Sequence, residues 1–284
     1  VPFDAGGSAD RMARGIASFL PDELGVPVLV LNKPGAGGQL GHTYFLQQPN
    51  DGNTLLFTPA TPYIANNILI TGADFTMDDF AFINAQWADW TMIATPVDRP
   101  YQTLGDLIEA IKANPGKLST GSTFGSAGHL STIVLLEALG LTQDDVRIVN
   151  YSGGGPLRTA LAGGQIDFSV VQGEGTEVVR DMIRPLAAFL EARNEDWDVP
   201  PINEALEPYG VTVPLISGSI RTLAASASFK EKHPDRFQKF VDATQSMLSK
   251  KSVQKYFSAS ALGGDWLGPE KSTELLNTNY QALV

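Results

Sequence analysis

The sequence predicts an α/β protein built from two domains. At 284 residues the chain is long enough for two domains of ordinary size, and its 43% hydrophobic and 18% charged residues are typical of a folded globular protein. Short runs rich in Val, Ile, Leu and Phe alternate with longer segments of helical period, which is the pattern of an α/β fold. No apolar run approaches a length of about 20 residues, which a helix needs to cross a bilayer.

The apolar runs and helical periods give the order of the elements. The candidate strands are 26–31, 54–58, 82–85, 91–95, 118–121, 146–150, 167–171, 186–190 and 211–217. The first helix is expected to begin at Ser8, a good N-cap, with Asp10 in the first turn, where an acid suits the helix dipole. Thr103 and Asp106 resemble a capping box. Nearly continuous helix is expected over 230–261, followed by a final helix from Pro269.

Two places suit a domain boundary. Residues 95–100 form a proline-rich turn between a strand and a capped helix, and a second crossing is expected near 214–219. The first domain would then be discontinuous, residues 1–97 plus 218–284, with a second domain, 98–217, inserted into it. Two crossings make a hinge, and hinged domains usually close on a ligand held in the cleft between them.

Charge and cysteine content exclude several classes of function. The formal net charge is −11 and no cluster of Lys or Arg offsets it, which argues against a nucleic-acid partner. The chain has no cysteine, which removes disulfides, thiolate zinc sites and cysteine nucleophiles together.

The start of the sequence bears on export. Val1 to Phe3 run straight into a glycine turn, whereas a strand that feeds such a turn is expected to begin several residues earlier. We therefore expect the native chain to carry residues before Val1. The missing signal peptide is then weak evidence against export.

Three loops share one composition: a strand end, small residues, then a helix start. They are residues 3–10, 119–129 and 151–156. Glycine lets the backbone approach a ligand, and the first N–H groups of a helix lack partners and lie at its positive end. Ordinary βα turns favour the same residues. Several such loops in a hinged protein nevertheless indicate an anion site at the carboxyl ends of the strands.

Other motifs fail on their spacing. From Gly35 the third glycine of a dinucleotide loop falls one position late, at Gly41, and neither a phosphate loop nor a nucleophile elbow occurs. His42, His129 and His233 lie far apart without metal-ligand spacing. His42 is interpreted as helix packing or capping, and His129 as either a pocket residue or a structural one. We therefore expect no catalytic residue, metal or cofactor, and a binding function.

A series of motifs resembles the tripartite tricarboxylate transporter receptors, the TctC or Bug family. The motifs are V-P-F-x-A-G-G-S-x-D at 1–10, N-K-P-G-A-G-G at 32–38, P-N-D-G-x-T-L-L at 49–56, P-G-K-L at 115–118, V-x-Y-x-G at 149–153 and A-G-G-Q-I-D at 162–167. They keep their order from residue 1 to about 170 and continue loosely beyond. Each motif is weak alone, but the series is specific.

The resemblance implies a two-domain, periplasmic-binding-protein-like fold that closes around a small organic carboxylate and delivers it to membrane permease subunits. It places the protein in the periplasm, and we expect a monomer. Three classes of ligand remain candidates: a di- or tricarboxylate, an aromatic acid and an acidic amino acid. A sensory or scavenging carboxylate receptor remains an alternative, and an enzyme acting on a small carboxylate is the weaker one.

The resemblance also implies site residues. One wall would hold Phe3, Ala5, Gly6 and Ser8; the other would hold Ser122, Thr123, Ser126, Ala127 and His129; and Thr58, Ala60, Thr61, Ser152 and Gly153 would complete the site. The P-G-A-G-G stretch would be a structural turn beside it. No arginine lies in these loops, so backbone N–H groups and hydroxyls would hold the carboxylate.

The sequence also departs from the family pattern. Members often carry Asp-Asn after the strand at 167–171, where this chain has Gln-Gly followed by Glu174. Glu174 would either face the ligand, where it suits an ammonium or hydroxyl group, or be an exposed acid before a helix. Trp87, Trp90 and Tyr63 would form an aromatic wall or interdomain packing.

Overall fold

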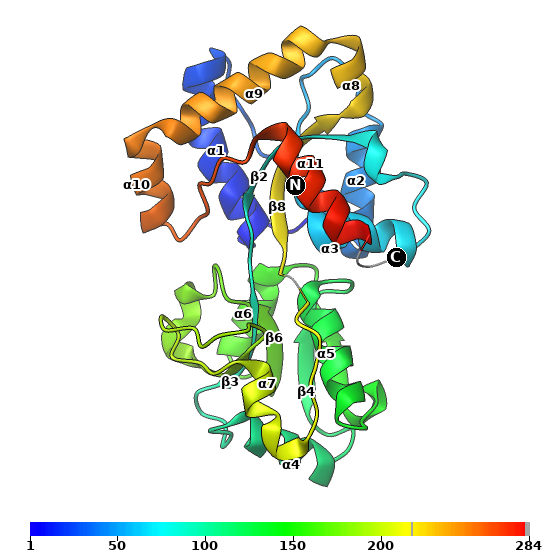
Figure 1. The fold of residues 1–284 in the computed structure, drawn as a ribbon, viewed down its shortest axis with the longest axis vertical. Helices are drawn as coiled ribbons and strands as arrows, with labels where there is room; N and C mark the ends of the chain where they lie inside the picture. The colour runs from blue at the N-terminus through cyan, green and yellow to red at the C-terminus, as the bar shows by residue number, and fades with distance from the viewer. Residues whose placement is uncertain (217, 282–284) are drawn as a thin grey trace. The chain divides into compact units, whose positions relative to one another are not determined.

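The chain divides into two compact units. The computed structural model describes residues 1–216 and 218–281 (Figure 1). Unit 1 comprises Val1–Ala88 and Ser219–Val284, and unit 2 comprises Asp89–Gly218. The first boundary therefore falls after residue 88 and not after residue 97, because strand β3 (Thr91–Pro96) pairs within the sheet of unit 2. The second falls after Gly218, next to residue 217, which lies outside the described residues.

Unit 1 is a three-stranded antiparallel sheet covered by helices. Its strands are β1 (Leu56–Pro59), β2 (Phe80–Trp87) and β8 (Ile220–Ser226), in the order β1-β8-β2. Its helices are α1 (Ser8–Leu24), α2 (Gln39–Leu46), α3 (Ala60–Leu69), α8 (Ala227–Lys232), α9 (Pro234–Ser249), α10 (Lys251–Ala259) and α11 (Gly268–Gln281), with 3₁₀ turns at Ala36–Gly38 and Met77–Asp79. The central strand thus comes from the far side of unit 2 in the sequence.

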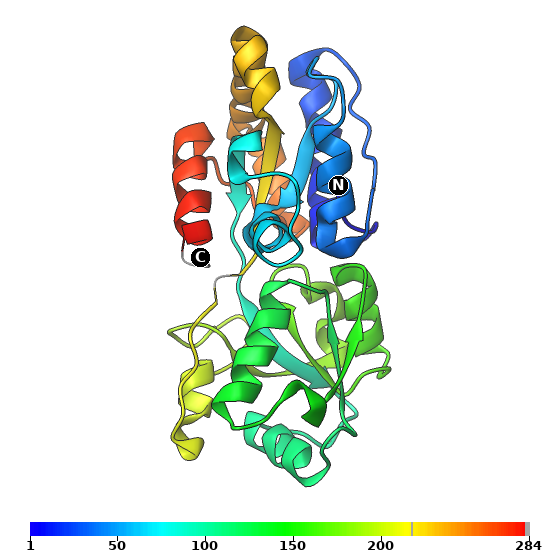
Figure 2. The same ribbon diagram turned by 90° about the vertical axis from the view of Figure 1, so that its right-hand side faces the viewer.

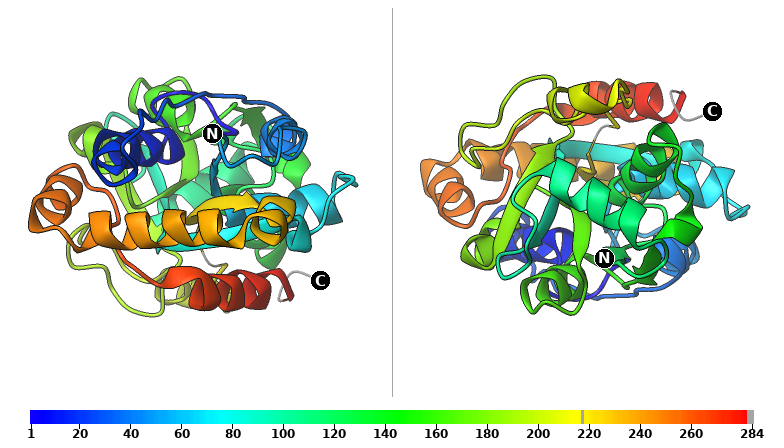
Figure 3. Two further views of the ribbon diagram at one scale, coloured as in Figure 1. Left: turned by 90° about the horizontal axis from the view of Figure 1, so that it is seen from above. Right: turned by 90° about the horizontal axis from the view of Figure 1, so that it is seen from below.

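Alternating side chains of these strands build two cores, as the period of two requires. Phe57 and Leu223 pack with α1, α9 and α10 on one face. Leu56 and Ala224 pack with α2, α3 and α11 on the other. Figure 2 shows α1 and α11 on opposite sides of the strands, and α9 and α11 lie side by side (Figure 3).

Unit 2 is a five-stranded mixed sheet. Its strands are β3, β4 (Ser119–Ser122), β5 (Arg147–Asn150), β6 (Phe168–Gln172) and β7 (Ile183–Ala188), in the order β5-β4-β6-β3-β7, with only β4 parallel to its two neighbours. Its helices are α4 (Leu104–Ala113), α5 (Ala127–Ala138), α6 (Gly154–Ala162) and α7 (Ile202–Ala205), with 3₁₀ turns at Gln143–Asp145, Glu177–Met182 and Glu207–Tyr209. Helices α4, α5 and α7 share one core and α6 packs on the other face.

Most of the predicted elements are present, and the capping box of Thr103 and Asp106 begins α4 as predicted. Two predicted strands are wrong. Residues 26–31 are extended but outside any sheet, and Leu29 is 90% exposed. Val1 contacts the end of this segment: its nitrogen donates to the Leu31 carbonyl, and its own carbonyl accepts from the N–H of the nearby Lys33, both at 2.8 Å.

The second wrong strand was predicted at 211–217, where residues 211–216 form no strand. Strand β8 begins at Ile220 instead. Its sequence, I-R-T-L-A-A-S, has few bulky apolar residues, so the hydrophobic pattern did not indicate it. The long predicted C-terminal helix is divided at His233 and at Lys250. Pro234 cannot donate a backbone hydrogen bond, which explains the first of these breaks.

None of the helices among the described residues is long and apolar enough to cross a membrane.

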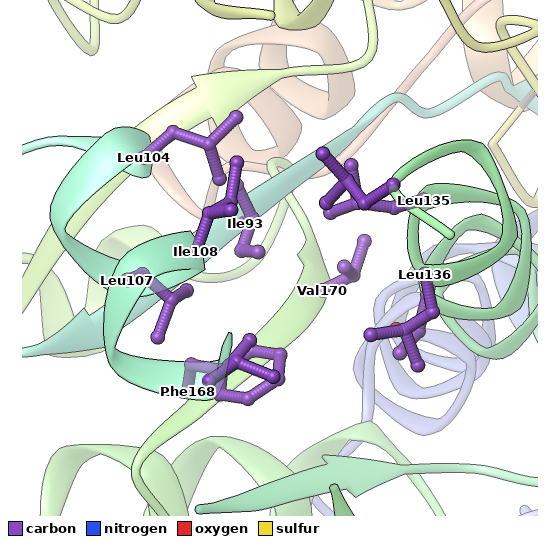
Figure 4. Close-up of a pocket in the computed structure, with 11 residues that line it drawn as sticks. Ile93, Leu104, Leu107, Ile108, Leu135, Leu136, Phe168 and Val170 are labelled. Carbon is purple, nitrogen blue, oxygen red and sulfur yellow. The ribbon is translucent and has the colours of Figure 1, made fainter. Parts of the chain in front are cut away.

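A cavity of about 10 Å³ lies in the core of unit 2, between α4 and α5 (Figure 4). Its walls are the apolar side chains of Ile93, Leu104, Leu107, Ile108, Ile111, Leu135, Leu136, Leu139, Phe168 and Val170, together with Thr132. The Thr132 hydroxyl donates to the Gly128 carbonyl at 2.8 Å. This space is at the lower limit for one water molecule, so it is a packing defect and no ligand site.

Replacing Leu107, which is fully buried against this cavity, with Ala should enlarge the void. The expected loss is about 2–5 kcal/mol in the free energy of unfolding of unit 2, measured by urea denaturation. The matched control is Leu29→Ala at the exposed extended segment, which should stay within about 0.5 kcal/mol. A loss of equal size in both variants would contradict this view of the core.

Candidate functional site

The first glycine-rich loop leads into α1, but its cap differs from the predicted one. Gly7, and not Ser8, is the N-cap, and no side chain caps the helix. Ser8 is the first helical residue, and its hydroxyl accepts a hydrogen bond from the Arg221 Nε at 2.9 Å. The first-turn N–H groups of α1 have no intrahelical acceptor, which is the usual condition of an anion-binding helix start.

Asp10 holds this loop in shape. Its buried carboxylate accepts hydrogen bonds from the Gly6 N–H, the Arg14 Nε and the Asn32 amide, each at 2.9 Å. Burial opposes ionisation of Asp10, but these bonds outweigh burial and hold its pKa below the ordinary value. The Gly6 N–H therefore serves the loop itself. The Asn32 amide also donates to the Phe3 carbonyl at 2.9 Å, which ties the N-K-P-G-A-G-G segment to the loop.

Arg221 is the residue that sequence reasoning missed. It lies on β8, is 1% exposed, and stands opposite Trp87 of β2 in the strand register. Its guanidinium carbon lies 4.0 Å from the centre of the Trp87 ring, a cation–π contact, while Nε reaches Ser8. The predicted loops contain no arginine, but folding brings this one to the start of α1 from 213 residues away. Within a run of small and apolar residues, an isolated arginine was the available signal.

The remaining residues of the first wall divide between packing and exposure. Phe3 is buried against Tyr63, with ring centroids 4.6 Å apart, whereas Ala5 and Gly6 are exposed. Gly38 of the P-G-A-G-G turn lies against Phe3: a Cβ at Gly38 would come within 3.1 Å of the ring. Phe3 and Tyr63 therefore pack against each other beside the loop, within unit 1.

Thr58 was predicted to bind ligand, and in the structure its hydroxyl contacts a side chain inside unit 1. Its fully buried hydroxyl lies 2.8 Å from His42 Nε2, while His42 Nδ1 lies 2.8 Å from the Asn67 side-chain oxygen. The Asn67 oxygen can only accept, so Nδ1 carries the proton and Thr58 donates to Nε2. Ala60 and Thr61 are also buried, and Thr61 bridges to Ile220 beside the sheet. These three residues support the sheet end of unit 1.

The second wall gathers at the start of α5. The Ser126 hydroxyl caps this helix by accepting from the His129 N–H at 3.0 Å. His129 Nδ1 accepts from the Gly125 N–H at 3.2 Å, which leaves the ring proton on Nε2 as a donor. Burial lowers the pKa of His129 and so favours this neutral form. The Ser122 hydroxyl points to the Thr123 carbonyl at 3.4 Å, a long bond that leaves it available to a better acceptor.

Two neighbours of this wall differ from expectation. Ala127 is fully buried, so its side chain packs inside unit 2. Phe124, which was not among the predicted residues, is 41% exposed and lies 5.4 Å from the His129 ring between centroids. An exposed aromatic ring beside a helix start suits the apolar part of a small organic ligand.

The third loop and its surroundings complete unit 2. Ser152 is exposed, Gly153 is the N-cap of α6, and the buried Arg158 approaches the Gly154 backbone. The Glu174 N–H donates to the Asp89 carboxylate at 3.2 Å, whereas a ligand-facing role for the Glu174 side chain stays a prediction. Trp90 covers Gly173, where a Cβ would come within 2.2 Å of the indole. Within residues 1–216 and 218–281, no group of three or more His, Asp or Glu residues could hold a metal ion.

The His42 network predicts a pH-dependent stability. Burial lowers the pKa of His42 from 6.5 to about 4, so the unfolded chain takes up its proton more readily than the folded one. The neutral, buried His42 therefore contributes to the free energy of unfolding fully above pH 6.5. This contribution is lost as the pH falls towards 4, and the loss is about 3 kcal/mol at most. Urea denaturation at pH 7.5, 6, 5 and 4.5 measures it.

The variant His42→Gln should be less stable at pH 7.5 and show a flatter loss of stability between pH 6.5 and 4. His233→Gln, which removes a histidine outside this network, is the matched control and should keep the wild-type slope. If the two variants show the same slope, another group is responsible.

Comparison with known proteins assigns the family. The family model described as "Tripartite tricarboxylate transporter family receptor", TctC, matches residues 12–261. The chain belongs to this family. Among curated relatives, a UPF0065 protein of Bordetella pertussis (strain Tohama I) is 33% identical over 175 residues, 60% of this chain and 52% of the relative. A UPF0065 protein of Cupriavidus necator is 28% identical over 267 residues, 92% of this chain and 79% of the relative.

The matched lengths differ between relatives. The chain spans 61% of the length of a UPF0065 protein from Pseudomonas sp. (strain P51) and 52% of the Bordetella protein.

Solved structures establish the fold. A periplasmic transporter matches with a TM-score of 0.81 at 26% identity, covering 99% of this chain and 92% of that one. A Rhodopseudomonas palustris protein solved with adipate matches at 0.82 and 24% identity, covering 100% and 93%. MatC of the same organism, with bound malate, matches at 0.81 and 23% identity, covering 99% and 95%. The two α/β units therefore have the fold of these solved proteins.

Proposed function

We propose that this TctC-family protein is an extracytoplasmic solute-binding receptor that captures a small organic carboxylate and delivers it to a membrane permease. The observation that carries the proposal is that each unit presents an anion-suited helix start. In unit 1 it is α1, which no side chain caps and where Arg221 holds Ser8. In unit 2 it is α5, with Ser122, Ser126 and the His129 Nε2–H.

The magnitudes show that hydrogen bonds must supply most of the affinity. Micromolar binding needs about 8 kcal/mol. A helix terminus contributes about 0.3–1 kcal/mol when exposed and ~2 kcal/mol when partly buried, so two termini are insufficient. Hydrogen bonds to a charged group add about 1.5–3 kcal/mol each, and the hydroxyls and first-turn N–H groups offer several. Apolar contact with Phe124 would add to this sum.

The family and the two loops support a further part of the proposal. The protein would close on its ligand, as the family resemblance implies. The acidic chain would gain its affinity for an anion from local donors, because salt screens its long-range charge within about 10 Å. The periplasm is the proposed location, the permease subunits of the tripartite system are the proposed partners, and the protein would act as a monomeric receptor without catalysis.

The ligands of two solved structures support a ligand class. The R. palustris protein was solved with adipate and MatC with malate, both dicarboxylates. We propose a dicarboxylate of this size for the present protein, with one carboxylate on the helix starts. An acidic amino acid or an aromatic acid would leave the same first carboxylate in place, so one screen can distinguish all three.

A thermal-shift screen tests the proposal, with malate, succinate, adipate, citrate, nicotinate, aspartate and the neutral diamide of adipate. At 100 times its dissociation constant, a bound acid should add about 2.7 kcal/mol of stability. The diamide should add none, because it lacks the charge that the helix starts favour. A flat response to every acid would refute the carboxylate assignment, and turnover of any acid would refute the receptor assignment.

Binding should also make the protein more compact. Small-angle scattering of the protein with a saturating concentration of an acid found in the screen should give a smaller radius of gyration than the protein alone. The neutral diamide serves as the control and should leave the radius unchanged. An identical radius with and without a confirmed ligand would contradict closure while leaving carboxylate binding intact.

A further inference from the structure

The hydrogen bond between Arg221 and Ser8 has a fixed direction. A guanidinium has five N–H donors and no acceptor, whereas a serine hydroxyl has one O–H donor and two lone pairs. Arg221 Nε must therefore donate, and the Ser8 oxygen must accept, across the 2.9 Å that separates them. The Ser8 proton is left to point at some other acceptor. Among the described residues, the Ser8 hydroxyl donates to none.

The guanidinium is held so that it cannot turn away. Its carbon lies 4.0 Å from the Trp87 ring centre, and the side chain is 1% exposed. Trp87 is itself wedged against Gly263, where a Cβ would come within 2.5 Å of the indole. A rigid cation thus polarises the Ser8 hydroxyl at the first residue of α1, where the helix dipole already favours negative charge.

We propose that Arg221 is a positioning residue that fixes the Ser8 hydroxyl as a hydrogen-bond donor to the ligand carboxylate. This inference rests on the proposed function and deepens it, because it names the group that makes the unit 1 wall selective for an anion. An amide or carboxylate side chain at position 221 could accept the Ser8 hydroxyl proton. The Ser8 hydroxyl would then no longer donate to the ligand. Arginine cannot accept a hydrogen bond, so the Ser8 hydroxyl remains available to donate to the ligand carboxylate.

Acetate is the probe, because it contains the carboxylate alone and needs no knowledge of the natural ligand. Titration of the full chain is followed by the ¹⁵N–¹H shifts of the Ser8, Ala9 and Asp10 amides, with acetamide as the neutral control. The wild type should show saturable shifts with acetate and none with acetamide. Arg221→Met and Ser8→Ala should each bind acetate about ten- to a hundred-fold more weakly, the range for one hydrogen bond to a charged group.

A double-mutant cycle separates positioning from a direct or merely structural effect. If Arg221 acts through Ser8, adding Arg221→Met to Ser8→Ala should weaken acetate binding less than two-fold further. Losses that multiply would overturn the proposal, as would wild-type affinity in Arg221→Met. Arg221→Gln, which keeps a polar group of similar reach but can accept from Ser8, should also lose affinity and serves if the methionine variant does not fold.

Arg11→Met is the matched charge control. Arg11 lies one turn along α1 and donates to the Ser260 carbonyl, so its removal changes the same charge without touching Ser8. It should weaken acetate binding less than three-fold. An effect equal to that of Arg221→Met would show that charge alone matters, and absence of acetate shifts at α1 in the wild type would also overturn the proposal.

The outcomes distinguish this inference from the proposed function. Acetate at α1 that depends on Ser8 and Arg221, together with no response in the acid screen, would refute the receptor function and support the positioning role. A screen that finds a ligand whose affinity is unchanged in Arg221→Met would support the receptor function and refute the positioning role of Arg221.

Discussion

The buried Arg221 guanidinium is the constraint that the rest of unit 1 accommodates. One side chain joins the central strand β8, the neighbouring strand β2 through Trp87, and the start of α1 through Ser8. A buried cation is costly unless it is well paired and hydrogen-bonded. Arg221 meets this requirement in part through Trp87 and Ser8, and it lies at the start of a helix, where a negative ligand is most favoured.

Around this group, hydrogen bonds hold the shape of the loop. Asp10 uses its carboxylate to hold Gly6, Arg14 and Asn32, and the Asn32 amide holds the Phe3 carbonyl. The donors of the first turn are therefore presented in one geometry, so binding does not have to order them. Preorganisation of this kind reduces the entropic cost of binding. It is also compatible with the glycine-rich composition, because glycine lets the backbone N–H groups approach a partner alongside the Ser8 hydroxyl.

The sequence predicted what depends on local pattern. The α/β class, the presence of α1 and the loop that leads into α5 follow from hydrophobic periodicity and loop composition close together in the chain, although the predicted Ser8 cap of α1 does not form. It could not predict contacts that depend on the packed fold. Thr58 carries a hydroxyl after a predicted strand, and only the fold shows that this hydroxyl faces His42. Arg221 lies on a strand too poor in bulky residues to be recognised, far from the loop it completes.

The strand order of unit 1 has a consequence for the order in which the chain can fold. Strands β1 and β2 do not pair with each other, since β8 lies between them. The sheet of unit 1 therefore cannot assemble until residues up to 226 are available, whereas the contiguous unit 2, Asp89–Gly218, can form its sheet from its own residues alone. The N-terminal segment must wait, with its future core exposed, for a strand made after an entire neighbouring unit. The pairing of β1 and β2 with β8 therefore joins residues far apart in the sequence, which is the kind of contact that slows folding.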